Sequence, residues 1–273
     1  MREFGEIAER LRRSTVQIFA RGRDGGGSGV IWSAGGRIVT NSHVARAAQA
    51  DVVLWDGRRL PARLISRDAR RDLAVLKVAD SSLPAAAAGD SDALRPGELV
   101  IAIGSPLGFA GALSTGVVHS VGTIPGMGRE RWIGANVRLA PGNSGGPLAD
   151  AQGRVVGINT AIVNGLGVAV PANAAADFLR RGARPSLGVT LQPVAHGLRI
   201  LAVEPDGPAA LASLRPGDIL VGTFERLTEM LDSGLDSGLD SGKATLRLPF
   251  FRGDVSRLRE VFVRLAPARA EAA

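Results

Sequence analysis

The feature that most constrains the fold of this chain is a long succession of short β-rich runs with turn signals between them. The first set reads TVQIFA, SGVIWS, RIVTN, ADVVLW, LPARLIS and DLAVLKV. The second set reads LVIAIGS, LSTGVVHSV, ANVRLA, GPLAD, RVVGINTAI and LGVAVP. Many short strands with turn signals between them are typical of β-barrels and sandwiches. We therefore expect two β units, with a crossover between them at the segment GDSDALRPG.

Helices flank the two β units. A first helix is predicted over residues 1–13, where apolar side chains recur at helical spacing: Phe4, Ile7, Ala8 and Leu11. A second helix is predicted over residues 171–182, with Asn173 as its N-cap and Gly182 just past its end. A smaller third unit follows this helix.

Composition excludes several classes of site. The chain has 273 residues, no cysteine and three widely separated histidines, so we expect no thiolate nucleophile, no disulfide and no zinc site. This pattern does not exclude a metal site built from carboxylates, but no residue is assigned to a metal and no cofactor is expected. The net charge of +7 comes almost wholly from arginine, but the arginines are scattered and aromatic residues make up only 4% of the chain. Nucleic acid is therefore not expected as a partner, because platforms for base stacking are scarce. No apolar run approaches the roughly 20 residues of a membrane span.

The segment LAPGNSGGPL, residues 139–148, places glycines on both sides of Ser144. Glycine admits backbone conformations closed to other residues and lets a ligand approach the chain closely. Such a turn suits a serine whose hydroxyl and backbone N–H must both face a reacting carbonyl. Taken alone, the segment is also compatible with an ordinary turn.

A nucleophilic serine needs a base to take its proton and a third group to orient that base. His43 follows a β run in IVTNSHV, and Asp72 precedes an apolar run in RRDLAVLKV. The chain order His, Asp, Ser is that of the chymotrypsin type. Each residue alone has a plain structural interpretation, but the three contexts together predict a catalytic triad.

These segments, with GSGVIWS, GDSDALRPGELVIAIGSPLG, STGVV and GRVVGINTAI, stand in an order that resembles the HtrA/Deg family of trypsin-like serine proteases with a C-terminal PDZ domain. The resemblance covers roughly residues 14–265, and it implies a protease domain of two chymotrypsin-like β-barrels at 14–182 and a small α+β PDZ domain at 183–266. The predicted helix at 1–13 precedes these domains, and a tail at 267–273 follows them.

The resemblance also implies roles for the site residues. His43 would be the general base, Asp72 its orienting carboxylate and Ser144 the nucleophile, while the N–H groups of Gly142 and Ser144 would form the oxyanion hole. The chain departs from the family at Asn136, where GANV stands in place of Gln-Thr-Asp-Ala.

The resemblance implies that substrate binds along the strand that follows the nucleophile, GINTAI. The expected residues are Asn159, Thr160 and Ala161 by their backbone, and Leu139, Ile158 and Ile162 by their apolar side chains. Ile158 and Ile162 are equally compatible with core positions. Because these stretches hold no acidic residue, we expect cleavage after small or medium aliphatic residues rather than after Arg or Lys.

The third unit resembles an HtrA-type PDZ domain. Its segment SLGV matches the loop that holds a peptide C-terminus by backbone N–H groups, namely Ser186, Leu187, Gly188 and Val189. The alternative is that this unit is only a docking or spacing element with no affinity for free peptides. The usual turn and strand after DILVG look deleted, and Leu-Asp-Ser-Gly then occurs three times over residues 231–242. We expect this repeat to be a surface loop, because it is too rich in glycine to continue a helix.

The sequence therefore predicts a serine endopeptidase that acts on unfolded or damaged proteins. The alternative is a catalytically weak chaperone or scaffold that binds through the PDZ groove. The resemblance implies a homotrimer, with protein or peptide substrates and peptide C-termini as partners. The charged N-terminus does not resemble a signal peptide, which predicts a cytoplasmic location for the chain as given and a cell-envelope location if its start was trimmed.

Overall fold

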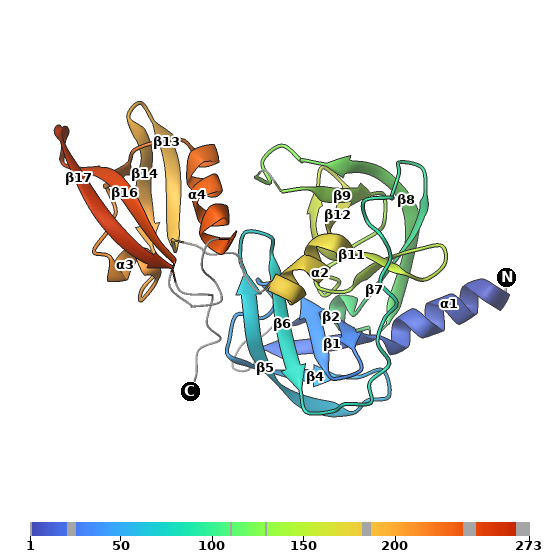
Figure 1. The fold of residues 1–273 in the computed structure, drawn as a ribbon. Coiled ribbons are helices and arrows are strands. Elements are labelled where there is room, and N and C mark those ends of the chain that lie inside the picture. Colours follow the sequence, from blue (N-terminus) through green and yellow to red (C-terminus); the bar gives the residue numbers. More distant parts are fainter. Residues whose placement is uncertain are drawn as a thin grey trace. The chain divides into compact units, whose positions relative to one another are not determined.

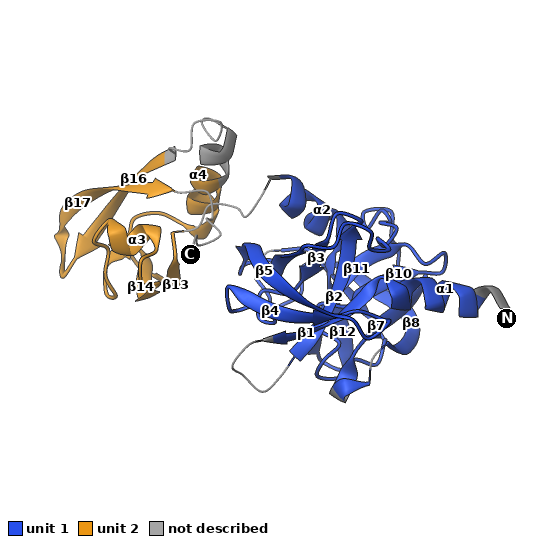
Figure 2. Ribbon diagram, turned by 90° about the horizontal axis from the view of Figure 1, so that it is seen from below, with its two compact units in different colours: residues 1–181, 270–273 blue, residues 182–269 orange. Residues whose placement is uncertain are grey.

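Figure 1 presents the fold in a computed structural model of the chain. The description covers residues 2–20, 26–109, 111–128, 130–181, 187–236 and 244–265. The chain divides into two compact units (Figure 2), of which the first takes in residues up to 181 and the second begins at 182. Among the described residues, no helix is both long enough and apolar enough to cross a membrane.

The first unit begins with α1 (Arg2–Arg13), which confirms the predicted amphipathic helix. Leu11 is buried, whereas Phe4 stays exposed, so the apolar face is fully covered only near its C-terminal end. The hydroxyls of Ser14 and Thr15 both donate to the Leu11 carbonyl and satisfy it where the helix ends.

Six antiparallel strands close into the first barrel in the order β1-β2-β3-β6-β5-β4. They are β1 (Thr15–Ala20), β2 (Gly26–Ser33), β3 (Arg37–Thr40), β4 (Gln49–Val53), β5 (Arg59–Asp68) and β6 (Leu73–Val78). Successive side chains of a strand point to opposite faces. The apolar residues of each run therefore meet inside the barrel, among them Ile18, Ile31, Ile38, Val52 and Leu76.

The second barrel also closes from six antiparallel strands, in the order β10-β11-β12-β9-β8-β7. They are β7 (Leu99–Gly104), β8 (Ala112–Gly122), β9 (Trp132–Ala135), β10 (Pro147–Asp150), β11 (Val155–Val163) and β12 (Leu166–Pro171), with a short 3-10 helix η1 (Pro106–Gly108) after β7. The crossover over residues 79–98 contains GDSDALRPG, as predicted. The fold class of two antiparallel barrels is confirmed.

The helix α2 (Ala172–Arg181) follows the second barrel. It begins one residue before Asn173, so the prediction of Asn173 as the N-cap is wrong. Asn173 instead lies in the first turn, where its backbone N–H donates to Ser91 Oγ at 3.1 Å. Its side-chain amide donates to Asp90 and Asp92, which fixes the crossover segment against the helix. Gly182 lies outside the described residues.

The second unit is a five-stranded antiparallel sheet in the order β13-β14-β15-β16-β17 with two helices, the small α+β fold that was expected. Its elements are β13 (Val189–Val194), β14 (Gly197–Val203), α3 (Pro208–Leu211), β15 (Ile219–Leu220), α4 (Phe224–Asp236), β16 (Ala244–Arg252) and β17 (Asp254–Leu265). Its core includes Leu187, Ile200, Leu220, Leu231 and Phe250. Residues 221–223 alone separate β15 from α4, so no strand lies between these two elements.

The expectation that Leu-Asp-Ser-Gly cannot continue a helix is wrong for its first copy. The helix α4 runs through residues 231–234 and ends at Asp236. Leu231 is buried in the core of the second unit. Burying a leucine contributes about 1.5–3 kcal/mol, which outweighs the cost of about 1 kcal/mol for one helical glycine. Residues 237–243 lie outside the described residues.

Candidate active site

His43 and Asp72 meet at one end of the first barrel. His43 lies just after β3 and Asp72 just before β6, and these strands pair as neighbours in the barrel. His43 Nδ1 lies 2.7 Å from Asp72 Oδ2, and the His43 backbone N–H donates to Oδ1 of the same carboxylate at 3.1 Å. The aspartate therefore holds both the ring and the backbone of the histidine.

The Asp72 carboxylate accepts four hydrogen bonds. Besides the two from His43, Ser42 Oγ donates to it at 3.0 Å, and Thr160 Oγ1 donates to it from the second barrel. Burial acts to raise the pKa of Asp72, but the hydrogen bonds from His43 and Thr160 outweigh burial and hold the pKa below its usual value. Asp72 is therefore ionised at neutral pH and suited to orient an imidazole.

The backbone at Asp72 is in the left-handed region, with φ of 51°. Aspartate tolerates this conformation better than most residues, and the residues on either side are anchored. Arg71 is buried before it and forms ion pairs with Asp177 of α2 at 3.5 Å and with Glu130 at 3.9 Å. Leu73 is wholly buried after it. The conformation that aims the carboxylate at His43 is therefore fixed from both sides.

Thr160 joins the aspartate to the serine. The register of β11 shifts between Asn159 and Ala161, so Thr160 occupies a β-bulge. A bulge redirects side chains next to a site, and here the Thr160 hydroxyl reaches Asp72 while its carbonyl accepts the Ser144 hydroxyl at 3.0 Å. Sequence reasoning assigned only the backbone of Thr160 to the site and missed this hydroxyl, because strand alternation does not reveal a bulge.

Ser144 lies in the turn before β10. The structure brings it to the same cluster as His43 and Asp72, but through Thr160. Among the described residues, no hydrogen bond joins Ser144 Oγ to His43. Hydrogen bonds between such groups are commonly loose or misaligned before substrate binds, and rotation about the serine Cα–Cβ bond redirects the hydroxyl.

The glycines around Ser144 are required by space and conformation. Gly142 has φ of 106°, and a Cβ at this position would lie 2.3 Å from the Ser105 carbonyl oxygen. Gly145 has φ of 87°, and a Cβ there would lie 2.0 Å from the Ser28 carbonyl oxygen. Within the described part of the chain, the N–H groups of Gly142 and Ser144 have no protein acceptor. Both are therefore available to a ligand, as an oxyanion hole needs.

Only some of the residues expected to bind substrate are accessible in the structure. Ile158 is wholly buried, so its side chain is a core residue and does not line an open pocket. The backbone of Asn159 is already occupied, because its N–H donates to Gly146 and its carbonyl accepts from Gly145. Ala161 and Leu139 are half-buried and Ile162 is 55% exposed, so these three remain accessible beside the site.

Asn136 supports the strand beside the site rather than the serine turn itself. Its Oδ1 accepts the Val117 backbone N–H at 2.6 Å. An amide oxygen can make this bond as a carboxylate oxygen would, so the departure from the family pattern preserves an acceptor for β8.

The loop before β13 in the second unit contains three of the four residues expected to hold a peptide carboxylate. Leu187 is buried, Gly188 has φ of 68° and Val189 begins β13. The Leu187 carbonyl accepts the N–H of Ala209 at 2.9 Å, which ties the loop to α3. β13 stands at the edge of its sheet, which is where a peptide strand can add. Ser186 lies outside the described residues.

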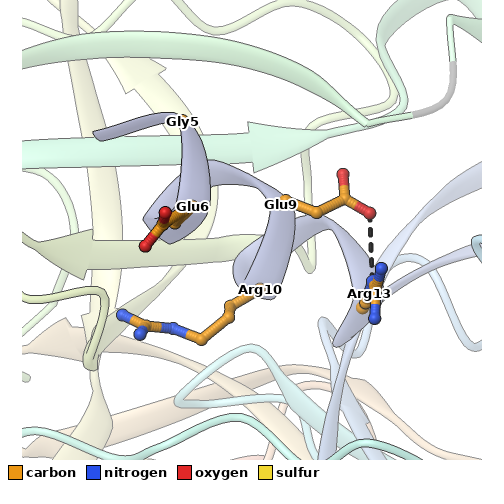
Figure 3. Close-up of a pocket in the computed structure, with 5 residues that line it drawn as sticks. All are labelled: Gly5, Glu6, Glu9, Arg10 and Arg13. Carbon is orange, nitrogen blue, oxygen red and sulfur yellow. Dashed lines mark hydrogen bonds and ion pairs between the residues drawn. The ribbon is translucent and has the colours of Figure 1, made fainter. Parts of the chain in front are cut away.

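A separate hollow of the first unit lies away from the cluster around Ser144. A hollow of about 440 Å³ lies beside α1 and is lined by Gly5, Glu6, Glu9, Arg10 and Arg13 (Figure 3). Its charged side chains are exposed, and Glu9 pairs with Arg13 at 3.0 Å. Across the described residues, no group of three or more His, Cys, Asp or Glu side chains is placed to hold a metal ion.

Comparisons with known proteins agree with this geometry. A family model described as a trypsin-like peptidase domain matches residues 27–158. "Putative serine protease HhoB" of Synechocystis sp. is 38% identical over 233 residues, covering 72% of this chain and 56% of the relative. "Probable periplasmic serine endoprotease DegP-like" of Halomonas elongata is 39% identical over 221 residues, covering 71% and 47%. The chain thus spans about half the length of the curated relatives it matches.

Solved structures match over nearly the whole chain. The HtrA-type protease AlgW with a tripeptide has a TM-score of 0.65 and 29% identity, covering 96% of each chain. A serine endoprotease from Yersinia pestis has a TM-score of 0.64 and 27% identity, covering 96% of this chain and 97% of that one. The two barrels and the cluster between them define a trypsin-fold serine protease. Within that class, the chain belongs to the HtrA/DegP-like proteins, and the sheet of its second unit is consistent with one PDZ domain.

Proposed function

We propose that this chain cleaves unfolded or damaged proteins by acyl-enzyme chemistry, with His43, Asp72 and Ser144 as its catalytic triad. The observation that carries the proposal is the direct His43–Asp72 hydrogen bond, linked through Thr160 to the Ser144 hydroxyl. An ionised aspartate, an imidazole and a serine in one cluster form the arrangement that acyl transfer requires.

In the proposed reaction, the Ser144 hydroxyl turns from Thr160 to His43 Nε2, gives up its proton and attacks the scissile carbonyl. The N–H groups of Gly142 and Ser144 stabilise the negative charge that forms on the carbonyl oxygen. His43 then returns the proton to the leaving amine, and water releases the acyl group by the same steps. Asp72 stabilises the charged imidazole throughout and keeps its Nδ1 protonated.

The test compares wild-type protein with Ser144→Ala in a digest of casein, with Ser82→Ala as a matched control at an exposed serine outside the site. We expect wild type and Ser82→Ala to cut casein, and Ser144→Ala to have no activity above background. A serine-directed phosphonylating reagent should label wild type at Ser144 alone. Undiminished cleavage by Ser144→Ala contradicts the proposal, and absence of both cleavage and labelling in wild type favours the alternative of a binding scaffold.

The fragments from the same digest test specificity. Ala161, Leu139 and Ile162 are the accessible apolar residues of the expected pocket. We therefore propose cleavage after Val, Ala, Leu or Ile, read by mass spectrometry. A majority of cuts after Arg or Lys contradicts this pocket assignment.

We propose further that residues 14–182 form the protease domain and residues 183–266 a domain that binds peptide C-termini. The support is the edge position of β13 and the backbone ties of the loop at Leu187 and Gly188. Family resemblance also supports a homotrimer, which light scattering of the purified protein measures directly; a monomeric mass contradicts it.

A further inference from the structure

Ser28 is a wholly buried residue of β2 that contacts the serine turn with both its side chain and its backbone. Its hydroxyl donates to the Gly142 carbonyl at 2.7 Å and accepts the Ser105 N–H at 2.9 Å. Its backbone N–H donates to the Ser144 carbonyl at 2.7 Å. A residue of the first barrel therefore holds two carbonyls of a turn that belongs to the second.

These bonds hold the peptide planes of the turn on both sides of the Asn143–Ser144 peptide. Three successive carbonyls are all turned inward: Gly142 to Ser28 Oγ, Asn143 to the Gly146 N–H at 3.0 Å, and Ser144 to the Ser28 N–H. In a trans peptide, the C=O and the next residue's N–H point to opposite sides. The inward carbonyl of Asn143 therefore directs the Ser144 N–H outward. The Ser28 hydroxyl holds the Gly142–Asn143 peptide, which lies between the two peptides that carry the Gly142 and Ser144 N–H groups.

We propose that Ser28 is a positioning residue that preorganises the oxyanion hole, an inference that rests on the proposed function. A hydroxyl is suited to this place because it donates and accepts at once. Without it, the Gly142 carbonyl retains only the Ser105 N–H, at 3.4 Å. The backbone bond from the Ser28 N–H to the Ser144 carbonyl remains, but the shorter bond to the Gly142 carbonyl is lost.

The test is Ser28→Ala, with Ser14→Ala as the matched control. Ser14 is also a buried serine whose hydroxyl donates to a carbonyl, that of Leu11, and it does not touch the serine turn. For Ser28→Ala we expect kcat on a peptide ester to fall about 10- to 100-fold with KM within twofold of wild type. This is less than the 10²–10³ loss typical when a donor is removed outright. Ser14→Ala should keep wild-type kcat.

A peptidyl boronic acid gives a second readout. It forms a tetrahedral adduct with a catalytic serine, so its inhibition constant should rise in Ser28→Ala by the same factor by which kcat/KM falls. Ser28→Cys fills the same site with a weaker hydrogen-bonding group and should show an intermediate loss. If Ser28→Ala does not fold, the same measurements are made on Ser28→Cys instead.

Three results overturn the inference while leaving the protease intact: kcat of Ser28→Ala or Ser28→Cys equal to wild type, an equal loss in Ser14→Ala, or an unchanged boronate inhibition constant. Failure of the proposed function is distinct, because wild type itself would then neither hydrolyse the ester nor react at Ser144. That result removes the basis of the inference.

Discussion

The candidate active site has two halves, the His43–Asp72 pair and the Ser144 turn, which are held in place by different kinds of group. The His43–Asp72 half is fixed by the Asp72 side chain, whose carboxylate accepts four hydrogen bonds. Three come from side chains and one comes from the His43 backbone N–H. The Ser144 half is fixed mainly through its own backbone: three successive carbonyls accept hydrogen bonds, one of them from the Ser28 hydroxyl, and the glycines leave no room for a side chain. We therefore expect the first half to be most sensitive to loss of a charged group and the second to be most sensitive to added atoms.

The largest effect is expected from removing the charge in the side-chain half. Asp72→Asn should reduce kcat by about 10⁴, because an amide no longer selects the imidazole tautomer that accepts the serine proton. Asp56→Asn is the matched control, since Asp56 pairs with Arg58 in the same barrel and lies outside the cluster. Steady-state hydrolysis of a peptide ester measures both. A loss below tenfold for Asp72→Asn contradicts the role given to this carboxylate.

In the backbone half, adding one methyl group should suffice. Gly142→Ala places a Cβ 2.3 Å from the Ser105 carbonyl oxygen, so the turn must shift and the proposed oxyanion hole should be lost. We expect kcat to fall about 10²- to 10³-fold, as when an oxyanion donor is removed. Gly57→Ala is the control, because Gly57 has a similar positive φ of 86° but open space around it. If both variants lose activity equally, backbone strain rather than crowding at the hole is responsible.

Variants of the two halves should differ in how their free energy of unfolding depends on pH. The pKa of Asp72 is lowered in the folded state, so its ionised form contributes stability above its unfolded pKa of about 3.9, and this is lost as pH falls through the folded value. The stability advantage of wild type over Asp72→Asn should therefore shrink from pH 7 to pH 3 in urea denaturation. The loss of stability in Gly142→Ala involves no titrating group. The difference in free energy of unfolding between wild type and Gly142→Ala should therefore stay constant from pH 7 to pH 3. If this difference also shrinks, the contrast between the two halves is wrong.

The smallest effect is expected in the second unit. Deleting residues 235–238 removes one Leu-Asp-Ser-Gly copy, yet the next copy supplies the same residues to the end of α4. We expect casein cleavage and the melting temperature to stay nearly unchanged, because loop closure depends only weakly on length. Leu231→Ala, which empties a core position, should instead cost about 2–5 kcal/mol. A large fall in melting temperature for the deletion would show that the copies after the first also contribute to the stability of the domain.

The barrels and the positions of the triad segments were predictable because they depend on local patterns. Alternating runs, glycine turns and the order of His43, Asp72 and Ser144 are all visible in the sequence. The contacts between segments were not. The Thr160 hydroxyl reaches Asp72 only because the pairing of β11 with β12 contains a bulge. Likewise, α4 continues into the repeat because Leu231 has a core to enter, which helix propensity does not reveal.

The bond from Ser28 to the serine turn has a consequence for folding order. His43, Asp72 and Ser28 belong to the half of the protease that leaves the ribosome first, while Ser144 and its turn follow some seventy residues after Asp72. Under the proposed mechanism, neither barrel alone holds all three triad residues, so the first barrel should have no proteolytic activity before the second has folded. Opening of either barrel should likewise end proteolysis.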